Sequence, residues 1–149
     1  MTDYGLDLAV IGNGRTAALV NPDARIMWWC LPRYDGDPVF CRLLSGDDEK
    51  GFTDVVLDKK VETQSQYVRN TAIVVTELTA SDGGRVRITD FAPRFANYGR
   101  TFRPPQLMRI IEPIAGMPRI TIRFRPTHHY GVPVPTHSAG SNHIRYWRD

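Results

Sequence analysis

The chain has 149 residues and a formal net charge of +3, with 42% hydrophobic and 23% charged residues. This composition excludes an intrinsically disordered chain, and the length suggests one domain. No apolar run approaches the roughly 18 residues that a membrane helix needs. The opening Met-Thr-Asp-Tyr-Gly-Leu-Asp lacks the basic and apolar regions of a secretory signal, so we expect a soluble, cytoplasmic protein.

The charge is divided unevenly along the chain. Residues 1–84 hold 8 Lys or Arg and 13 Asp or Glu, a net charge of −5, whereas residues 85–149 hold 11 Arg and 3 acidic residues, a net charge of +8. The arginines are scattered at strand spacing and form no run. This pattern favours solvated strand faces or a domain interface, and makes nucleic-acid binding a weaker alternative.

The chain begins with short apolar segments separated by turn residues. Residues 6–11 and 16–20 predict two strands joined through Gly12-Asn13-Gly14, because Asn-Gly tolerates the positive φ of a tight hairpin. Residues 21–24, Asn-Pro-Asp-Ala, predict a second turn, in which proline presets φ and the Asn and Asp side chains bind local amides.

A third strand is predicted over residues 25–31, and it is apolar on both faces. Strict alternation places on one face Ile26, Trp28 and Cys30, and on the other Met27, Trp29 and Leu31. A strand of this kind is usually covered on both sides. We therefore expect a loop or an absent partner to cover the second face.

The later strands are predicted from apolar or β-branched runs between turn signals. We expect strands at 52–57, 61–69, 71–79, 85–91, 107–114, 119–125 and 143–147, a strand or single helical turn at 39–44, and loops at 45–50, 93–105 and 126–142. Residues 71–91 predict a hairpin around Asp82-Gly83-Gly84.

Residues 119–125 show the clearest period of two. We expect Ile120, Ile122 and Phe124 to point inward, and the alternate residues to point outward: Arg119, Thr121, Arg123 and Arg125. No segment shows helical periodicity over ten or more residues. The sequence therefore predicts an all-β chain folded as an antiparallel β-sandwich.

Three blocks of sequence, taken in order, resemble a known family. They are Gly12-Asn-Gly-Arg-Thr-Ala-Ala-Leu-Val with Trp29-Cys-Leu-Pro-Arg-Tyr-Asp35; Tyr67-Val-Arg-Asn-Thr71 through Thr89-Asp-Phe-Ala-Pro93; and Leu107 to Gly116 with residues 122–126 and 129–131. Together they cover most of the chain. They are similar to the N-terminal β-sandwich domain of bacterial glucoamylase- and trehalase-type glycoside hydrolases of family 15.

The resemblance implies a single non-catalytic N-terminal domain over residues 1–149, supersandwich-like and truncated. In that family the chemistry lies in a C-terminal (α/α)-barrel, which this chain lacks. The intact enzyme would hydrolyse maltooligosaccharide- or trehalose-type α-glucosides with inversion. The domain would brace the barrel and lend a loop to the active-site rim. We expect the chain alone to be inactive and to need no cofactor.

This sequence departs from the family pattern at two places near the third strand. Trp28 stands where relatives tend to carry an aspartate, and Gly36-Asp37 replaces a serine-type turn.

The candidate site residues are Trp29, Arg33, Tyr34 and Asp35, which would contact sugar or the barrel. A guanidinium and a carboxylate can both bind vicinal hydroxyls, and a tyrosine ring can lie against a sugar face. The alternative is a structural turn in which Arg33 pairs with Asp35. Because neighbouring strand residues face opposite sides, Trp28 and Trp29 cannot both serve one surface.

No residue is assigned a catalytic or metal-binding role. An inverting hydrolase needs two carboxyl groups about 6.5–9.5 Å apart. The acidic residues at 35, 37 and 47–49 lie in expected turns or loops, where nothing raises a pKa. An inward Asp90 is expected to be paired and to tie down the following loop. The histidines at 128, 129, 137 and 143 match no zinc spacing. Cys30 and Cys41 are expected to be buried thiols, with a disulfide left open.

Two other functions stay open. One is an independent carbohydrate-binding module, with an oligosaccharide as partner. The other is a basic protein or nucleic-acid adaptor that uses the arginine-rich half. If a barrel-facing surface is exposed, the isolated chain is also expected to associate with itself.

Overall fold

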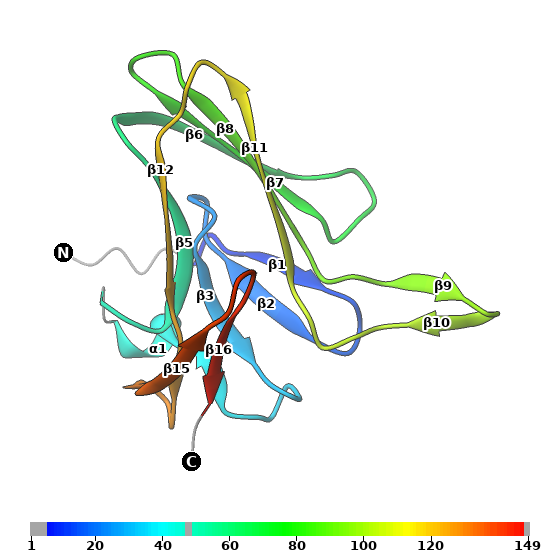
Figure 1. The fold of residues 1–149 in the computed structure, drawn as a ribbon. Coiled ribbons are helices and arrows are strands. Elements are labelled where there is room, and N and C mark those ends of the chain that lie inside the picture. Colours follow the sequence, from blue (N-terminus) through cyan, green and yellow to red (C-terminus); the bar gives the residue numbers. More distant parts are fainter. Residues whose placement is uncertain (1–5, 47–48, 148–149) are drawn as a thin grey trace.

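The computed structural model describes residues 6–46 and 49–147, which form two facing antiparallel β-sheets, an antiparallel β-sandwich as predicted (Figure 1). Asp47 and Asp48, in the predicted loop 45–50, lie outside the described residues. No helix in the described ranges is long and apolar enough to cross a membrane.

The first sheet has the strand order β1-β2-β3-β5-β12, with β4 paired to β3. The strands are β1 (Ala9–Gly12), β2 (Ala17–Val20), β3 (Ile26–Cys30), β4 (Pro38–Phe40), β5 (Phe52–Leu57) and β12 (Ile120–Arg125). Between β4 and β5 lies the short helix α1 (Arg42–Ser45). The predicted segment 39–44 is thus the end of a strand followed by a helical turn.

The second sheet has the order β11-β8-β7-β6. Its strands are β6 (Lys60–Tyr67), β7 (Val74–Ala80), β8 (Arg85–Phe91) and β11 (Met108–Ala115). The predicted hairpin over residues 71–91 is confirmed as β7 and β8, which pair from Val74 with Asp90 to Thr79 with Arg85.

Two apolar clusters fill the space between the sheets. One joins Val55 and Leu57 of β5 to residues of the second sheet, and it contains Ala24, Val55, Leu57, Leu78, Ala80, Val86 and Ile88. The other lies under β1 to β4 and contains Ile11, Ala18, Val20, Ile26, Phe40 and Val74. Both cysteines are free and buried, as predicted.

The predicted faces of β3 are wrong because the strand contains a β-bulge. Leu19 pairs with Trp28 and Val20 pairs with Ile26, so Met27 is the extra residue. A bulge shifts the alternation by one position. Trp29, not Trp28, therefore shares the core face with Ile26.

The predicted burial along β12 is wrong in part. Ile120 packs against the core, but Ile122 is 59% exposed and Phe124 is 43% exposed. Arg123 and Asp54 lie together on the sheet face opposite Ile122 and Phe124. Their ion pair leaves Arg123 only partly exposed. The reason is the position of β12, which is the edge strand of its sheet and pairs only with β5 among the described residues.

Two segments predicted as loops contain strands instead. Residues 93–105, here called the arm, contain β9 (Phe95–Asn97) and β10 (Arg100–Phe102), which pair as a ribbon that projects from the sandwich (Figure 1). Residues 126–142 contain β13 (Thr127–His128), β14 (Val132–Pro133) and β15 (Thr136–Ala139). β15 pairs with β16 (Ile144–Trp147), the predicted last strand.

Candidate functional site

The predicted site falls on the end of β3 and the turn that follows it. After β3 the chain passes through a cis Leu31–Pro32 peptide, and the amide of Gly36 donates a hydrogen bond of 2.9 Å to the carbonyl oxygen of Arg33. A Cβ on Gly36 would lie 2.5 Å from the carbonyl oxygen of Leu31, so the close approach of the backbone requires glycine here.

This turn presents a charged pair and an aromatic ring to solvent. Arg33 Nε lies 3.0 Å from Asp35 Oδ1, and Arg33 Nη2 donates to Asp35 Oδ2 at 3.0 Å. The two side chains are 77% and 71% exposed, and Tyr34 between them is 58% exposed. An ion pair this exposed contributes little to stability. Both groups therefore remain available to hydrogen-bond a ligand or another surface.

Asp37 attaches the turn to a distant loop. Its Oδ2 accepts a hydrogen bond of 2.8 Å from the amide of His129, and its Oδ1 accepts one of 3.3 Å from the amide of Tyr130. Both of those residues have a positive φ. The sequence did not single out Asp37 as an anchor, because the bonds span more than ninety residues. The only local signal was an acidic residue just after Gly36.

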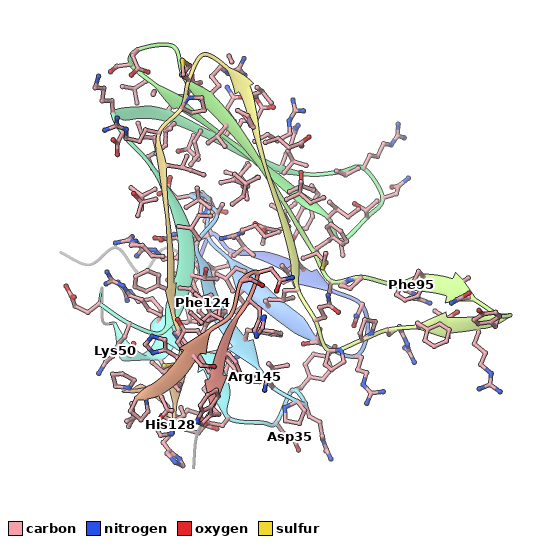
Figure 2. All side chains as sticks on the ribbon, in the orientation of Figure 1. Asp35, Lys50, Phe95, Phe124, His128 and Arg145 are labelled. Carbon is pink, nitrogen blue, oxygen red and sulfur yellow. The ribbon has the colours of Figure 1, made fainter. Side chains whose placement is uncertain are left out.

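Trp29 lies apart from this exposed turn. Its Nε1 donates a hydrogen bond of 2.8 Å to Thr16 Oγ1, and its ring stacks on Phe40 with centroids 6.0 Å apart. The structure thus brings Arg33, Tyr34 and Asp35 together, while Trp29 is held on the core side of β3. Figure 2 shows Asp35 in the loop at the end of the molecule away from the turn between β11 and β12.

Trp29 begins a series of ring contacts that leads to the C-terminal hairpin. Phe40 meets Phe124 edge-on at 5.4 Å, Phe124 contacts Tyr146 at 5.3 Å, and Tyr146 stacks on His137 at 5.6 Å. Beside this series lies a mostly apolar groove of about 310 Å³ lined by residues that include Trp29, Phe124, Tyr146 and Trp147. Exposed aromatic rings next to an apolar groove suit the flat face of a sugar or an apolar surface.

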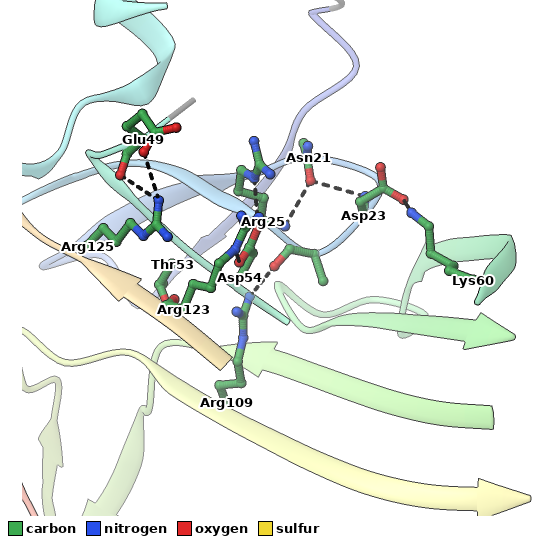
Figure 3. Close-up of polar contacts among 11 residues, drawn as sticks. Asn21, Asp23, Arg25, Glu49, Thr53, Asp54, Lys60, Arg109, Arg123 and Arg125 are labelled. Carbon is green, nitrogen blue, oxygen red and sulfur yellow. Dashed lines mark hydrogen bonds and ion pairs between the residues drawn. The ribbon is translucent and has the colours of Figure 1, made fainter. Parts of the chain in front are cut away.

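The buried carboxylate of Asp54 is held by arginine side chains on the outer face of the first sheet (Figure 3). Its Oδ2 accepts from Arg25 Nε at 3.0 Å and its Oδ1 accepts from Arg123 Nε at 2.8 Å. The guanidinium groups of Arg25, Arg123 and Arg125 lie over the ring of Phe52, at 4.5, 5.0 and 5.7 Å from its centroid. These cations cover an aromatic side chain that would otherwise face water.

A second buried carboxylate, Asp90, pairs with an arginine of the neighbouring strand. Arg109 Nε and Nη2 donate to its two oxygens at 2.6 and 2.9 Å. The prediction that Asp90 is inward and paired is confirmed. Its partner is Arg109 of β11, and among the described residues its side chain forms no hydrogen bond to the loop that follows it, so that part of the prediction is wrong.

Several titratable groups outside the turn have shifted pKa values. The hydrogen bond from Arg87 lowers the pKa of Glu77. Burial acts to raise the pKa of Asp23, but hydrogen bonds from Lys60 and Thr63 outweigh it and the pKa is lowered. None of these groups lies in the Arg33–Asp35 turn.

The histidines do not gather into a metal site in the part of the chain that the structure describes. Within those ranges no group of three or more His, Cys, Asp or Glu is placed to hold a metal ion. The rings of His128 and His129 lie 4.6 Å apart, while His137 stacks on Tyr146.

Comparisons with known proteins converge on one family. The family described as "Trehalase-like, N-terminal" matches residues 6–144. The chain is 35% identical over 134 residues to a trehalase of Thermoplasma volcanium, a match covering 84% of this chain and 20% of that protein. It is 39% identical over 88 residues to trehalase 1 of Sulfolobus acidocaldarius, covering 58% of this chain and 15% of that protein.

A second trehalase of Sulfolobus acidocaldarius, trehalase 2, is 28% identical over 127 residues, a match that covers 85% of this chain and 19% of that protein. The chain thus spans about a fifth of the length of these curated relatives. No solved structure matches it significantly.

Proposed function

Because the chain belongs to the trehalase-like N-terminal domain family, we propose that it is the non-catalytic N-terminal domain of an α-glucoside hydrolase. The observation that carries this proposal is its coverage of about a fifth of trehalases from two archaeal genera. The enzyme would be an inverting hydrolase of family 15, related to bacterial glucoamylases, acting in the cytoplasm on trehalose or a maltooligosaccharide.

The catalytic carboxyl groups are proposed to lie in a C-terminal (α/α)-barrel. An inverting hydrolase needs one carboxylic acid and one carboxylate with a water molecule between them. Asp54 and Asp90, the buried carboxylates among the described residues, are each bound by arginine side chains. In each case the guanidinium partners occupy the carboxylate oxygen atoms. Both contacts therefore support structural roles for these residues.

The turn of Arg33, Tyr34 and Asp35 is proposed to lie at the active-site rim or the barrel interface. Support comes from the hydrogen bond within the turn and from those that Asp37 accepts from the amides of His129 and Tyr130, which fix the backbone while the three side chains stay exposed. A fixed backbone that presents polar groups loses little conformational entropy on binding. Trp29 would support this surface from the core side of β3.

A second candidate function is that of an independent carbohydrate-binding module. It is favoured by the groove of about 310 Å³ lined by Trp29, Tyr146 and Trp147. In this case the isolated chain should bind soluble oligosaccharides by itself.

The experiment begins with the open reading frame that contains this sequence, read past the codon of Asp149. We expect some 400 further codons from the resemblance, and a product that releases glucose from trehalose or maltotetraose. The 149-residue chain should release none. In the longer enzyme, Arg33→Ala should lower kcat/KM while the fold, followed by circular dichroism, stays unchanged.

Calorimetry on the isolated chain separates the alternatives. Binding of maltotetraose would favour the carbohydrate-binding module, and salt-dependent binding of a short DNA duplex would favour a nucleic-acid adaptor. Glucose release by the isolated chain would overturn the proposal of a non-catalytic domain.

A further inference from the structure

The arm, residues 93–105, extends away from both sheets (Figure 1). Residues 94–103 are all exposed, and β9 and β10 form three residue pairs, from Phe95 with Phe102 to Asn97 with Arg100. A two-stranded ribbon of this length buries almost nothing and is marginally stable by itself. The arm therefore adds little to the folding of the sandwich that carries it.

The base of the arm, where it leaves the sandwich at Pro93 and Pro104, is nevertheless held by hydrogen bonds. The buried side chain of Asn13 donates through Nδ2 to the carbonyl oxygens of Pro93 and Pro104, at 2.9 and 2.8 Å. Its Oδ1 accepts hydrogen bonds from the amides of Arg15 and Thr16, at 3.0 and 3.1 Å. One amide side chain thus joins both legs of the arm to the hairpin of β1 and β2, and the direction of the arm is set by the first sheet.

The turn at the tip of the arm contains an exposed tyrosine with a strained backbone conformation. Tyr98 and Gly99 form the two-residue turn with φ values of 49° and 70°. Positive φ at both positions suits Asn-Gly, and a bulky residue such as tyrosine is uncommon there. The Tyr98 side chain is 92% exposed, so no contact within the described chain compensates for the strain. Strain that persists in this way is typical of a functional position.

The side chains of the arm have the composition of a protein interface. Phe95 and Phe102 stack with ring centroids 5.5 Å apart while remaining 47% and 41% exposed. The arm also carries three arginines and no acidic residue, and no described residue forms an ion pair with Arg94, Arg100 or Arg103. Tyrosine and arginine are enriched among the hot-spot residues that contribute most of the binding energy at interfaces. Arginine also binds carboxylates bidentately.

From these observations we infer that the arm is a docking element that binds an acidic surface on the catalytic domain of the same polypeptide. The positive charge of the arm favours an acidic partner surface. The catalytic domain is chosen as occupant because the trehalase relatives are more than four times as long as this chain, and a tethered partner is present at high effective concentration. This inference rests on the proposed function.

The test uses the product of the complete open reading frame with the photo-crosslinker p-benzoylphenylalanine in place of Tyr98. The control carries it in place of Met117, which is 96% exposed in the turn between β11 and β12, away from the arm. After irradiation, the protein that is not crosslinked to a second copy is isolated. Mass spectrometry of this monomer should find crosslinks from position 98 to segments beyond Asp149. The control should give few such crosslinks.

Charge dependence is tested in the same protein with a variant that combines Arg94→Gln, Arg100→Gln and Arg103→Gln. The crosslink yield from position 98 should fall about threefold or more, because three cationic contacts are lost. Crosslinks to residues 1–84 of a second copy would identify the acidic half of this chain as the occupant, and would overturn the inference. So would the absence of crosslinks.

Glucose release by the unmodified protein is measured in parallel. A protein that crosslinks as expected but releases no glucose would contradict the proposed function and leave the intramolecular docking of the arm standing. A protein that releases glucose without crosslinks would contradict only the docking.

Discussion

Asp90 and Arg109 form a buried ion pair between neighbouring strands of the second sheet. The carboxylate of Asp90 has no exposed surface, and it accepts hydrogen bonds of 2.6 and 2.9 Å from Arg109. Arg109 Nη2 also donates at 2.6 Å to the carbonyl oxygen of Ala24, in the turn between β2 and β3 (Figure 3). One guanidinium therefore fixes the second sheet to a turn of the first.

Replacing Arg109 by leucine should strongly destabilise the fold, because it leaves the carboxylate of Asp90 buried without a cation. We expect a loss of about 3–5 kcal/mol in the free energy of unfolding, measured by urea denaturation. The matched control is Arg33→Leu, which removes an exposed ion pair and should cost less than about 1 kcal/mol. Equal losses in the two variants would contradict the role given to Arg109.

Replacing Asn13 by alanine should loosen the arm. The carbonyl oxygens of Pro93 and Pro104 lose their donors, and the expected cost is about 1–3 kcal/mol. Trypsin cleavage after Arg100 should become faster, which timed digestion and mass spectrometry can measure. Gln64→Ala, on the exposed strand β6, is the control and should leave the cleavage rate unchanged. An unchanged rate in the Asn13 variant would show that other contacts fix the arm.

The contribution of Glu77 to stability should depend on pH. Its pKa in the folded state is lowered, chiefly by the hydrogen bond from Arg87. The stabilisation is therefore fully present above the unfolded pKa of about 4.3 and is lost as the pH falls through the lower, folded pKa. Wild type should be more stable than Glu77→Gln at pH 7, and urea denaturation should show this difference closing below pH 4. A constant difference down to pH 3 would count against the ion pair.

Replacing Tyr98 by asparagine should stabilise the isolated chain. Asparagine tolerates the left-handed conformation better than tyrosine, and the expected gain is about 0.5–1 kcal/mol. Thermal unfolding measures it. Tyr34→Asn is the control, because Tyr34 is 58% exposed and is not among the described residues with positive φ, so no gain is expected. A loss of stability on changing Tyr98 would mean that its ring makes contacts within this chain.

The isolated chain should associate with itself through the apolar surface around β12. Ile122 and Ile144 are each 59% exposed, and Phe124 and Trp147 are more than 40% exposed. Apolar surface gathered in this way promotes association. Ile122→Asn should shift sedimentation velocity profiles toward the monomer, whereas Met117→Asn, in the turn between β11 and β12, should not. A sharp wild-type monomer at high concentration would contradict this prediction.

The sequence predicted those strands whose side chains face one filled core. β5 was predicted with its observed bounds, and β7 and β8 were predicted as a hairpin, whose Val74, Leu78, Val86 and Ile88 are all buried between the sheets. The turn at residues 21–24 was also predicted. As expected, the side chain of Asn21 binds local amides: its Oδ1 accepts hydrogen bonds from Asp23 and Arg25 at 3.1 and 2.8 Å. These features depend on local spacing, which the sequence contains.

The wrong predictions concern strands whose burial or pairing depends on their place in the folded sheets and not on the spacing of apolar residues in the sequence. The bulge at Met27 inverts the faces of β3, and no residue in the run Ile-Met-Trp-Trp-Cys signals it. Ile122 is exposed because β12 lies at a sheet edge. β9 and β10 were missed because each has three residues and their turn lacks the usual Asn-Gly pair. The pairing of Arg33 with Asp35 is the one that the structural alternative for this turn predicted, whereas the anchoring by Asp37 was not predicted.

The pairing of β12 with β5 has a consequence for how the nascent polypeptide matures. The chain leaves the first sheet after Leu57, builds the whole second sheet, and returns only at Ile120. Strands β6, β7 and β8 can pair in order as they emerge from the ribosome. One edge of β5 can pair with β3 at once, but its other edge stays unpaired until β12 has been made. Until then the backbone N–H and C=O groups along that edge of β5 are unpaired. They could bind a chaperone at this stage of synthesis.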